Sequence, residues 1–459
     1  MANAFWPRRM VKRPDRVAPV TGGLVRATVC TLLAFGAAAA EAEPGEAEPG
    51  EADRVSQSPV RLFTFTAVRW GGPIDIRLYE RDAAAAKDAA DSVFALAKQI
   101  DEVFSDYDPD SGLNQFCRAV REGVAAQDGE VFTPFEVSVP SGLMRVLEDS
   151  SRRVATQTPG GLVDPTIGPL THLWRKARRL KRLPTDEQIA TARASVGFEK
   201  LQLQPAPIEQ WGLDPNPEPG RPDLMQPIPH TVLAAPPQLQ LDFGAFLKGL
   251  ALDEMRRAMK RRGVKHLLID AGGDIVCAGF VLDESGEPSR PWRVGIAPTV
   301  NVRDAPQTFL NLGTRKSGPN DLAIATSGDA AQHMVLDGRR YSHIIDPRTG
   351  QPIERSMSVT VLATSGVAAD SVATALNIVG PDGADEFFER LLNPPDGPLT
   401  QERRRQGRRL PLLIGRIAWI DHNGEEQLWV GGSGGRDGSA VEVWETLLVE
   451  PESDGSDAE

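Results

Sequence analysis

The stretch RYSHIIDPRTGQPI, residues 340–353, joins the end of a predicted strand to a dense group of turn residues. Asp337-Gly338, just before it, is typical of a type I′ hairpin, whose two central residues need positive φ. A simple hairpin does not require so many polar side chains at one corner. We therefore expect a site suited to a phosphorylated ligand, where six residues come together across the hairpin: Thr326, Ser327, Asp329, Ser342, His343 and Asp346.

The segments on either side of this stretch show both strand and helix patterns. Alternating apolar residues predict strands at 63–68 and 74–79, and helical spacing predicts a helix at 82–103. Residues 238–244 are predicted to form a strand that leads into a helix ending near Met259. Helices and strands mix without regular βαβ alternation, which favours an α+β fold with mixed sheets and flanking helices in one large unit.

Composition indicates a folded protein and excludes some partners. The chain has 459 residues, with 41% hydrophobic and 25% charged residues and a formal net charge of −12. An acidic chain is poorly suited to bind nucleic acid, because such binding releases counterions through clustered Lys and Arg. Outside the N-terminal segment the cysteines are Cys117 and Cys277, and the sequence leaves open whether they form a disulfide.

Residues 1–40 have the pattern of an export signal. A basic segment, MANAFWPRRMVKRPDR, precedes the apolar run ATVCTLLAFGAAAA at 27–40, which ends in small residues. Fourteen residues are too few to span a bilayer comfortably. We expect an exported protein, in the periplasm or at the outer face of the cytoplasmic membrane, with membrane association only through this segment if it stays uncleaved.

The remaining chain divides by composition. Residues 41–59 are acidic and rich in Pro and Gly, which predicts a flexible linker. The folded unit is predicted at 60–449, interrupted by Pro-rich insertions at 205–237 and 393–412 that we expect to be loops without regular structure. The acidic tail at 450–459 is predicted to be disordered.

Two short segments contain candidate ligands for a phosphorylated molecule. In DFGAFLKGLALD (242–253), Asp242 ends a predicted strand and Lys248 lies in the following helix, whose N-terminus favours phosphate. In AADSVATAL (368–376), Asp370 and Thr374 share one helix face, and their oxygens suit Mg²⁺. The alternatives are ordinary helix capping for the first segment, and a cap with a back-bonded threonine for the second.

Several other motifs are excluded by their surroundings. GGSGG at 431–435 matches the nucleophile elbow, but no histidine follows it in the chain. Asp242-Phe243-Gly244 resembles the metal-binding triplet of kinases, but the chain has no matching catalytic loop or P-loop. CxxC, HExxH and EF-hand spacings do not occur.

Taken in chain order, the motifs resemble one family. The segments FSDYDPDSGLNQF, VDPTIGPLTHLW, DFGAFLKG, LIDAGGD, PWRVGI, ATSGD, YSHIIDPRTGQPI and SVTVLA with AADSVATAL are similar to those of the ApbE family, the FAD:protein FMN transferases. The resemblance covers roughly residues 60 to 450, and the run His-Ile-Ile-Asp-Pro-Arg-Thr-Gly is its most specific part.

This resemblance implies an Mg²⁺-dependent enzyme that transfers the FMN half of FAD to a Ser or Thr hydroxyl of an acceptor flavoprotein, releasing AMP. The acceptor would be a redox flavoprotein of the cell envelope. By matching position, the metal ligands would be the main-chain carbonyl of Ala245, Asp370 and Thr374, with His343 and Asp370 as catalytic residues. The implied FAD contacts are Trp70, Tyr107, Leu162, Val163, Asp164, Asp242, Lys248, His343 and Ile345.

The chain also departs from the family pattern. Trp70-Gly71-Gly72 stands where Met-Gly-Thr is usual, Cys117 where asparagine is common, and Ala330 where tyrosine is frequent. Two alternatives stay open, the first because water needs no acceptor pocket and the second because of these departures. One is an Mg²⁺-dependent FAD pyrophosphatase, in which water replaces the acceptor hydroxyl, and the other is a catalytically silent flavin-binding protein.

Overall fold

The computed structural model describes residues 59–128, 131–151, 158, 160–206, 224–296, 308–312, 321–328, 333–393, 412–434 and 439–449. The predicted export signal, nearly all of the linker, the acidic tail and much of both insertions lie outside these ranges, as do Asp329 and Ala330. Within the described ranges, no helix combines the length and apolar character needed to cross a membrane.

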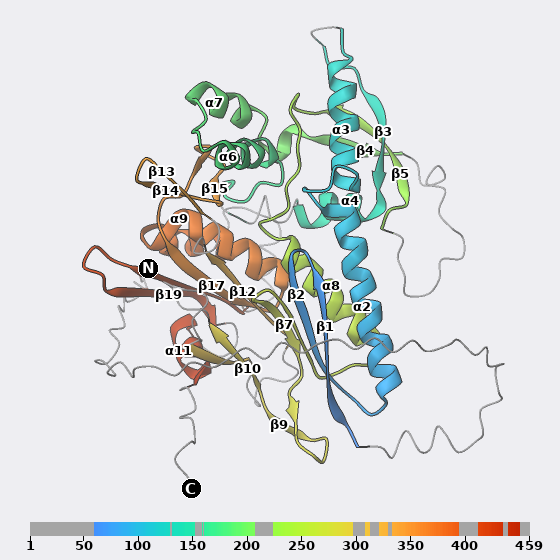
Figure 1. The fold of residues 1–459 in the computed structure, drawn as a ribbon, viewed down its shortest axis with the longest axis vertical. Coiled ribbons are helices and arrows are strands. Elements are labelled where there is room, and N and C mark those ends of the chain that lie inside the picture. Colours follow the sequence, from blue (N-terminus) through green and yellow to red (C-terminus); the bar gives the residue numbers. More distant parts are fainter. Residues whose placement is uncertain are drawn as a thin grey trace, which may run out of the picture.

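A large antiparallel sheet forms the centre of the protein. Among the described residues it has eight strands, in the order β1-β2-β6-β7-β12-β17-β18-β19, and each neighbouring pair is antiparallel. Together with the helices beside it, this sheet confirms the α+β class (Figure 1). The strands are β1 (Arg61–Arg69), β2 (Gly72–Glu80), β6 (Leu267–Ala271), β7 (Asp274–Ala278), β12 (Leu322–Gly328), β17 (Met357–Ala363), β18 (Leu412–Ile420) and β19 (Glu426–Gly434).

Both faces of the sheet are covered, because successive side chains of a strand point to opposite faces. Ile269 and Val276 belong to a core shared with helices α2 (Ala83–Phe104), α8 (Leu247–Arg261) and α9 (Gly366–Leu392). Leu268 and Ile275 belong to a second core on the opposite face. That core is closed by β10 (Trp292–Ile296), β11 (Thr308–Leu312) and α11 (Ala440–Leu447), with β20 (Leu448–Val449) paired to β11 (Figure 1).

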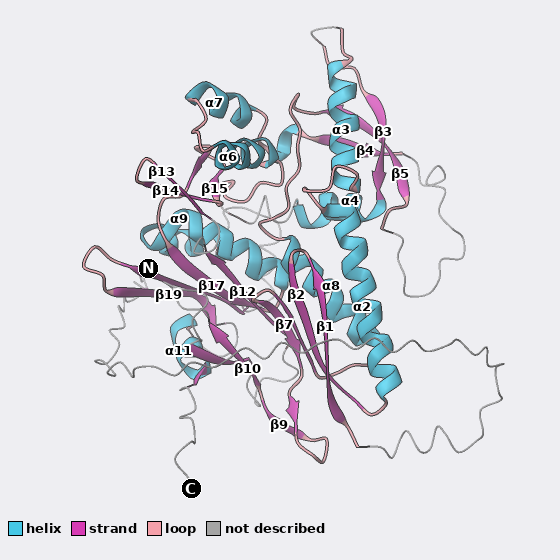
Figure 2. Ribbon diagram, viewed as in Figure 1, coloured by secondary structure: helices cyan, strands magenta, loops and turns pink. Residues whose placement is uncertain are grey.

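Two smaller groups of elements lie beyond one end of the large sheet, as Figure 2 shows. One contains α3 (Gly112–Ala125), β3 (Phe135–Pro140), α4 (Ser141–Arg145), the π-helix η1 (Val146–Ser151), β4 (Gln202–Pro205) and β5 (Pro227–Ala234). The other contains α6 (Gly168–Leu180), α7 (Asp186–Ala194), β13 (His333–Leu336), β14 (Arg339–Ser342), β15 (Ile345–Asp346) and β16 (Gln351–Pro352). The remaining short elements are η2 (Phe198–Lys200), β8 (Val281–Leu282) and β9 (Pro288–Arg290).

The prediction that residues 205–237 lack regular structure was wrong at their C-terminal end. Pro227–Ala234 forms β5, the middle strand of the sheet β3-β5-β4. Proline is usually confined to the edges of a sheet because it lacks an N–H. Here Pro227 begins the strand, and the carbonyl of Pro229 still accepts a hydrogen bond from Ala206.

The strand predicted at 238–244 was also wrong. The segment contains no strand, and its backbone bonds to loops and side chains, as when Asp242 N donates to Pro165 O at 2.8 Å. Leu239, Leu241 and Phe243 are all buried, so the alternating pattern came from burial without strand pairing. The predicted strands at 63–68 and 74–79 and the helix at 82–103 are confirmed as β1, β2 and α2.

Candidate active site

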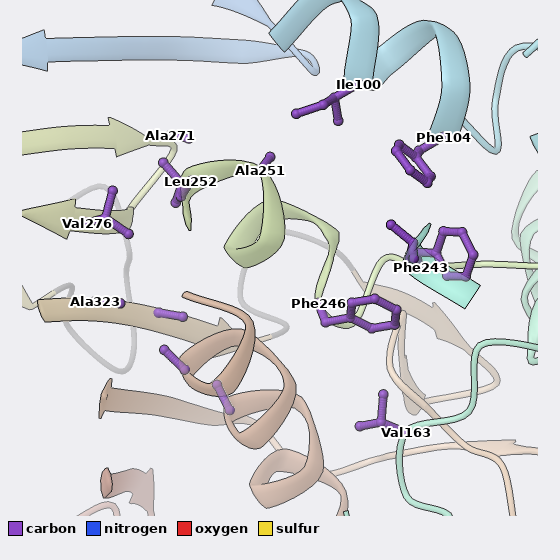
Figure 3. Packing of buried hydrophobic residues seen from close by; sticks show 14 of the residues in the cluster. Ile100, Phe104, Val163, Phe243, Phe246, Ala251, Leu252, Ala271, Val276 and Ala323 are labelled. Atoms are coloured by element: carbon purple, nitrogen blue, oxygen red, sulfur yellow. The ribbon is translucent and has the colours of Figure 1, made fainter. Parts of the chain in front are cut away.

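The segment that enters α8 is anchored in the core by aromatic side chains. Phe243 packs edge-on against Phe104 of α2, with ring centroids 5.8 Å apart, and against Phe246 at 5.5 Å. Figure 3 shows these rings beside Val163, with Leu252 of α8 facing the strands at Ala271 and Val276. Fixed aromatic packing on both sides leaves the backbone at Gly244 and Ala245 little freedom to move.

Helices α8 and α9 touch through glycine. A Cβ atom added to Gly249 would lie 2.1 Å from the carbonyl oxygen of Gly366, and one added to Gly366 would lie 2.3 Å from that of Gly249. Only hydrogen fits at these two positions, so the two backbones meet directly. This close crossing brings the start of α8 against the first half of α9, where Asp370 and Thr374 lie.

Three of the predicted site residues meet at this crossing. Asp370 Oδ2 accepts a hydrogen bond from the backbone N–H of Gly249 at 3.0 Å. The Thr374 hydroxyl lies 3.5 Å from the carbonyl oxygen of Ala245, which is long for a bond between a hydroxyl and a carbonyl. The cap and back-bonded threonine considered above do not match this geometry, because Asp370 lies inside α9 and Thr374 faces α8.

The donor set at the crossing fits a hard divalent cation. Carboxylate, hydroxyl and backbone carbonyl oxygens are the protein ligands that Mg²⁺ prefers, and Mg²⁺ commonly completes its shell with water and substrate phosphate. Among the described residues, no three His, Cys, Asp or Glu side chains gather closely enough to hold a metal ion by themselves. A cation at this crossing would therefore depend on the Ala245 carbonyl and the Thr374 hydroxyl as well as on Asp370.

Lys248 forms an ion pair with Asp274, a residue that the sequence reasoning did not select. Asp274 begins β7, is 2% exposed, and also accepts a hydrogen bond from the backbone N–H of Thr326 at 3.1 Å. Burial lowers the pKa of Lys248, but the Asp274 and Asp370 carboxylates outweigh burial and raise it. Asp274 could have been selected from the motif LIDAGGD, in which it is the last residue and follows two turn glycines.

Asp370 is in an unusual electrostatic environment. Burial and the nearby Asp274 carboxylate raise the pKa of Asp370 to about 7, while Lys248 and the Gly249 N–H act in the opposite direction. Buried carboxylates ionise reluctantly unless positive charge is close. The site thus brings together two buried acids and one lysine, and a cation would favour the ionised form of Asp370.

A second group of predicted residues surrounds Arg175 of α6. Its guanidinium lies 4.4 Å from the ring centroid of Tyr107 and 3.5 Å from Asp242 Oδ2, and it also donates to Asp106. Burial and Asp242 raise the pKa of Asp106. Burial and Arg175 lower the pKa of His172. Arg175 and Asp106 were missed in the sequence, although Asp106 directly precedes Tyr107.

The segment 162–164 is predicted to contact FAD, and its side chains face the protein. Leu162 and Val163 are each 3% exposed. Asp164 accepts hydrogen bonds from the backbone of Thr166 and of Phe198, at 2.8 and 3.1 Å. A ligand would therefore meet this segment chiefly through main-chain atoms.

The hairpin corner at residues 340–353 mostly satisfies its own polar groups. Ser342 Oγ accepts from the N–H of Ile344 at 3.1 Å, and Asp346 pairs with Arg348. Ile345 is buried, whereas the His343 side chain is exposed. The corner is held to α6 by Trp174, whose indole N–H donates to Gly350 O at 2.9 Å.

The other members of the predicted cluster bond elsewhere. Thr326 and Ser327 lie on β12, where Thr326 N donates to Asp274 and Ser327 O accepts from Asn377 Nδ2 at 3.0 Å. Trp70, which is outside this cluster and was predicted to contact FAD, forms the turn between β1 and β2 with φ of 52°. Its side chain packs against the main core. The structure therefore ties the β12 residues to the α8–α9 crossing, and the Ser342 and Asp346 side chains to their own corner.

An α+β sheet flanked in this way is the architecture of solved flavin transferases. The flavin transferase ApbE from Vibrio cholerae matches with a TM-score of 0.57 and 25% identity, covering 85% of this chain and 100% of that one. The apo form of the Pseudomonas stutzeri flavinyl transferase ApbE shares the fold, with a TM-score of 0.55 and 23% identity, over 82% of this chain and 96% of that one.

The sequence comparison names the family. The ApbE family model matches residues 70–394, and the chain belongs to the ApbE family. The FAD:protein FMN transferase of Haemophilus influenzae is 28% identical over 311 residues, which are 67% of this chain and 77% of that protein. The FAD:protein FMN transferase of Escherichia coli K12 is 30% identical over 293 residues, 63% of this chain and 70% of that protein.

Proposed function

We propose that this protein is an Mg²⁺-dependent FAD:protein FMN transferase. Its family membership and its relatives support the activity. The observation that carries the proposal is the meeting of the Ala245 carbonyl, the Thr374 hydroxyl and Asp370 at the α8–α9 crossing, with Lys248 beside them. That arrangement combines hard oxygen ligands with a cationic group, which is what a diphosphate and its cation require.

The proposed reaction exchanges one phosphorus–oxygen bond for another. The hydroxyl oxygen of an acceptor Ser or Thr attacks the phosphorus of the FMN half and gives its proton to a base. A phosphoester bond forms while the bond from that phosphorus to the bridging oxygen breaks, and AMP leaves with the bridging oxygen. A bound Mg²⁺ would supply positive charge against the diphosphate, which otherwise repels the attacking oxygen.

Within this reaction the residues of the chain have distinct roles. Asp370, Thr374 and the Ala245 carbonyl would hold the cation. Lys248 would contact a phosphate after exchanging its ion pair with Asp274 for the ligand. His343 is the candidate proton acceptor, since its side chain is exposed at the hairpin corner formed by residues 340–353. Trp70, Tyr107, Asp164, Asp242 and Ile345 would contact the rest of FAD.

We also propose that the protein acts after export, on a redox flavoprotein of the cell envelope. The support is the basic, then apolar, then small-residue pattern of residues 1–40. Export would place the enzyme in the periplasm or at the outer face of the cytoplasmic membrane. Cell fractionation with an antibody against the folded part tests this location, and recovery of the protein in the cytoplasmic fraction would contradict it.

The activity is tested by incubating the purified protein with FAD, Mg²⁺ and a threonine-containing flavoprotein acceptor from the same genome. We expect intact-mass spectrometry to show an acceptor that gains one FMN, with one AMP released per acceptor. Asp370→Asn should abolish the gain, and Asp382→Asn, on the exposed side of α9, should preserve it. Free FMN and AMP with an unmodified acceptor would instead identify an FAD pyrophosphatase, and no turnover would favour a silent flavin-binding protein.

A further inference from the structure

Helix α8 and the segment that enters it run antiparallel to α9 and make three polar contacts with it, at positions four residues apart, in addition to the glycine contact. Ala245 faces Thr374, Gly249 faces Asp370, and these two contacts form the proposed cation site. The third contact, one turn further along α8, is made by Asp253. Gly249 and Asp253 lie four residues apart on one face of α8, and Ala245 lies four residues before Gly249, in the segment that enters the helix.

Asp253 binds the first turn of α9 through several donors. Its carboxylate accepts hydrogen bonds from Ser365 Oγ at 2.7 Å, from the N–H of Gly366 at 2.9 Å and from the N–H of Val367 at 3.2 Å. The first N–H groups of a helix have no partner within it, and the helix dipole favours a negative charge there. A residue of α8, rather than the N-cap Ser365, therefore provides the cap of α9.

Arg256 fixes Asp253 to the sheet. It lies three residues further along α8 and donates to Asp253 Oδ1 at 2.8 Å. It also donates to Leu322 O at 3.1 Å and to Thr364 O at 3.0 Å, at the ends of the strands that flank the crossing. Asp253 is 2% exposed and Arg256 7% exposed, so water cannot replace these contacts.

We propose that Asp253 and Arg256 are positioning residues for the cation site, because they fix the rotation and axial position of α9 relative to α8. One residue of slippage would rotate α9 by about 100° and turn Asp370 and Thr374 away from α8. The glycine contact allows the helices to approach closely but does not fix their register. The inference rests on the metal site of the proposed function.

The experiment measures cation binding directly, with Mn²⁺ as the probe and its electron paramagnetic resonance signal as the readout. We expect Asp253→Asn to weaken Mn²⁺ binding at least about tenfold, as loss of supporting contacts does at other metal sites. FAD affinity without metal and the circular dichroism spectrum should stay unchanged. Glu254→Gln is the matched control, since Glu254 pairs with Arg257 at the same spacing on the same helix but on a more exposed face.

A second variant separates positioning from simple helix capping. In Asp253→Asn combined with Ser365→Asp, the new carboxylate caps α9 from its own N-cap, without a link to α8. We expect this double variant to regain thermal stability and keep the weakened Mn²⁺ binding. Recovery of Mn²⁺ affinity together with stability would overturn the proposal, as would an unchanged affinity in Asp253→Asn.

The outcomes also separate this inference from the proposed function. A wild-type protein that binds no Mn²⁺ would refute the metal site, and with it any role of Asp253 in placing that site. A wild-type protein that binds Mn²⁺ but transfers no FMN would refute the transferase alone. In that case, weaker Mn²⁺ binding in Asp253→Asn would still support the positioning role.

Discussion

Replacing Gly249 by alanine tests how closely α8 and α9 must approach for the site to form. The added methyl group would lie 2.1 Å from Gly366 O and 2.9 Å from the Cβ of Asp370. Ordinary contact needs more than 3.4 Å, so the helices must separate by about 1 Å at the crossing. Both neighbours belong to α9, whose first turn is held by Asp253, so the separation cannot be absorbed by one flexible side chain.

The size of the effect follows from that displacement. Overpacking of a closely packed contact costs about 1–3 kcal/mol of unfolding free energy. A misplacement of about 1 Å at reacting groups costs on the order of 100-fold in rate. We therefore expect Gly249→Ala to remain folded, with a modest fall in the urea midpoint, and to lose roughly 100-fold in FMN transfer.

The assay combines urea unfolding with transfer measured at saturating FAD and a range of Mg²⁺ concentrations. Gly383→Ala is the control, because its added methyl group would also be crowded, 3.1 Å from the Val379 Cβ, but across the kink at Gly380 and away from the crossing. We expect the control to retain transfer. If Gly249→Ala kept wild-type transfer and wild-type Mg²⁺ dependence, the close approach of the two helices would not be what assembles the site.

Three further predictions concern single groups. Thr374→Val should raise the Mg²⁺ concentration needed for transfer at least about tenfold, while Thr374→Ser, which keeps the hydroxyl, should not. Arg175→Lys should weaken FAD binding and cost about 1 kcal/mol in urea unfolding, because lysine lacks the planar fork that reaches Asp106 while stacking on a ring. Burial raises the pKa of Cys117 and Cys277 to about 12 from an ordinary 9.0, so unfolded thiols ionise first and stability must fall above pH 9. At pH 10 each thiol should cost about 1.4 kcal/mol, and a Cys117→Ala variant that showed no shallower pH dependence would contradict this.

Local sequence patterns predicted many of the helices and strands but not which elements they pack or pair with. The hairpin at Asp337-Gly338 was predicted from turn chemistry, and both residues have positive φ, 52° and 76°. Residues 238–244 alternate like a strand, yet they are buried without pairing to another strand. The prediction failed because alternating burial gives the same sequence pattern whether or not the segment pairs. The two cysteines are free and buried, a result that depends on the distance between α3 and β7 and not on either local sequence.

The candidate site shows the same division between local and long-range information. The four-residue spacing of Asp370 and Thr374 predicts one helix face, and this face does meet α8. The spacing does not reveal that Gly249 and Asp253 extend a matching row on α8, because that requires the direction and the register of the crossing. Arg175 was missed for a similar reason, since its partners lie about seventy residues away on either side and its own neighbours are ordinary helix residues.

The register of the crossing also explains why polar groups are tolerated in so apolar a region. Asp253 and Asp370 are both nearly excluded from water, and each unpaired buried charge would be costly. Asp253 is balanced by Arg256 and by the start of α9, so its charge is satisfied within the protein. Asp370 has one backbone donor, and its nearest lysine is already paired with Asp274. The protein therefore stabilises the charge of Asp253, which fixes the helices, and leaves Asp370 short of positive charge. A divalent cation binds most favourably at a carboxylate in that condition.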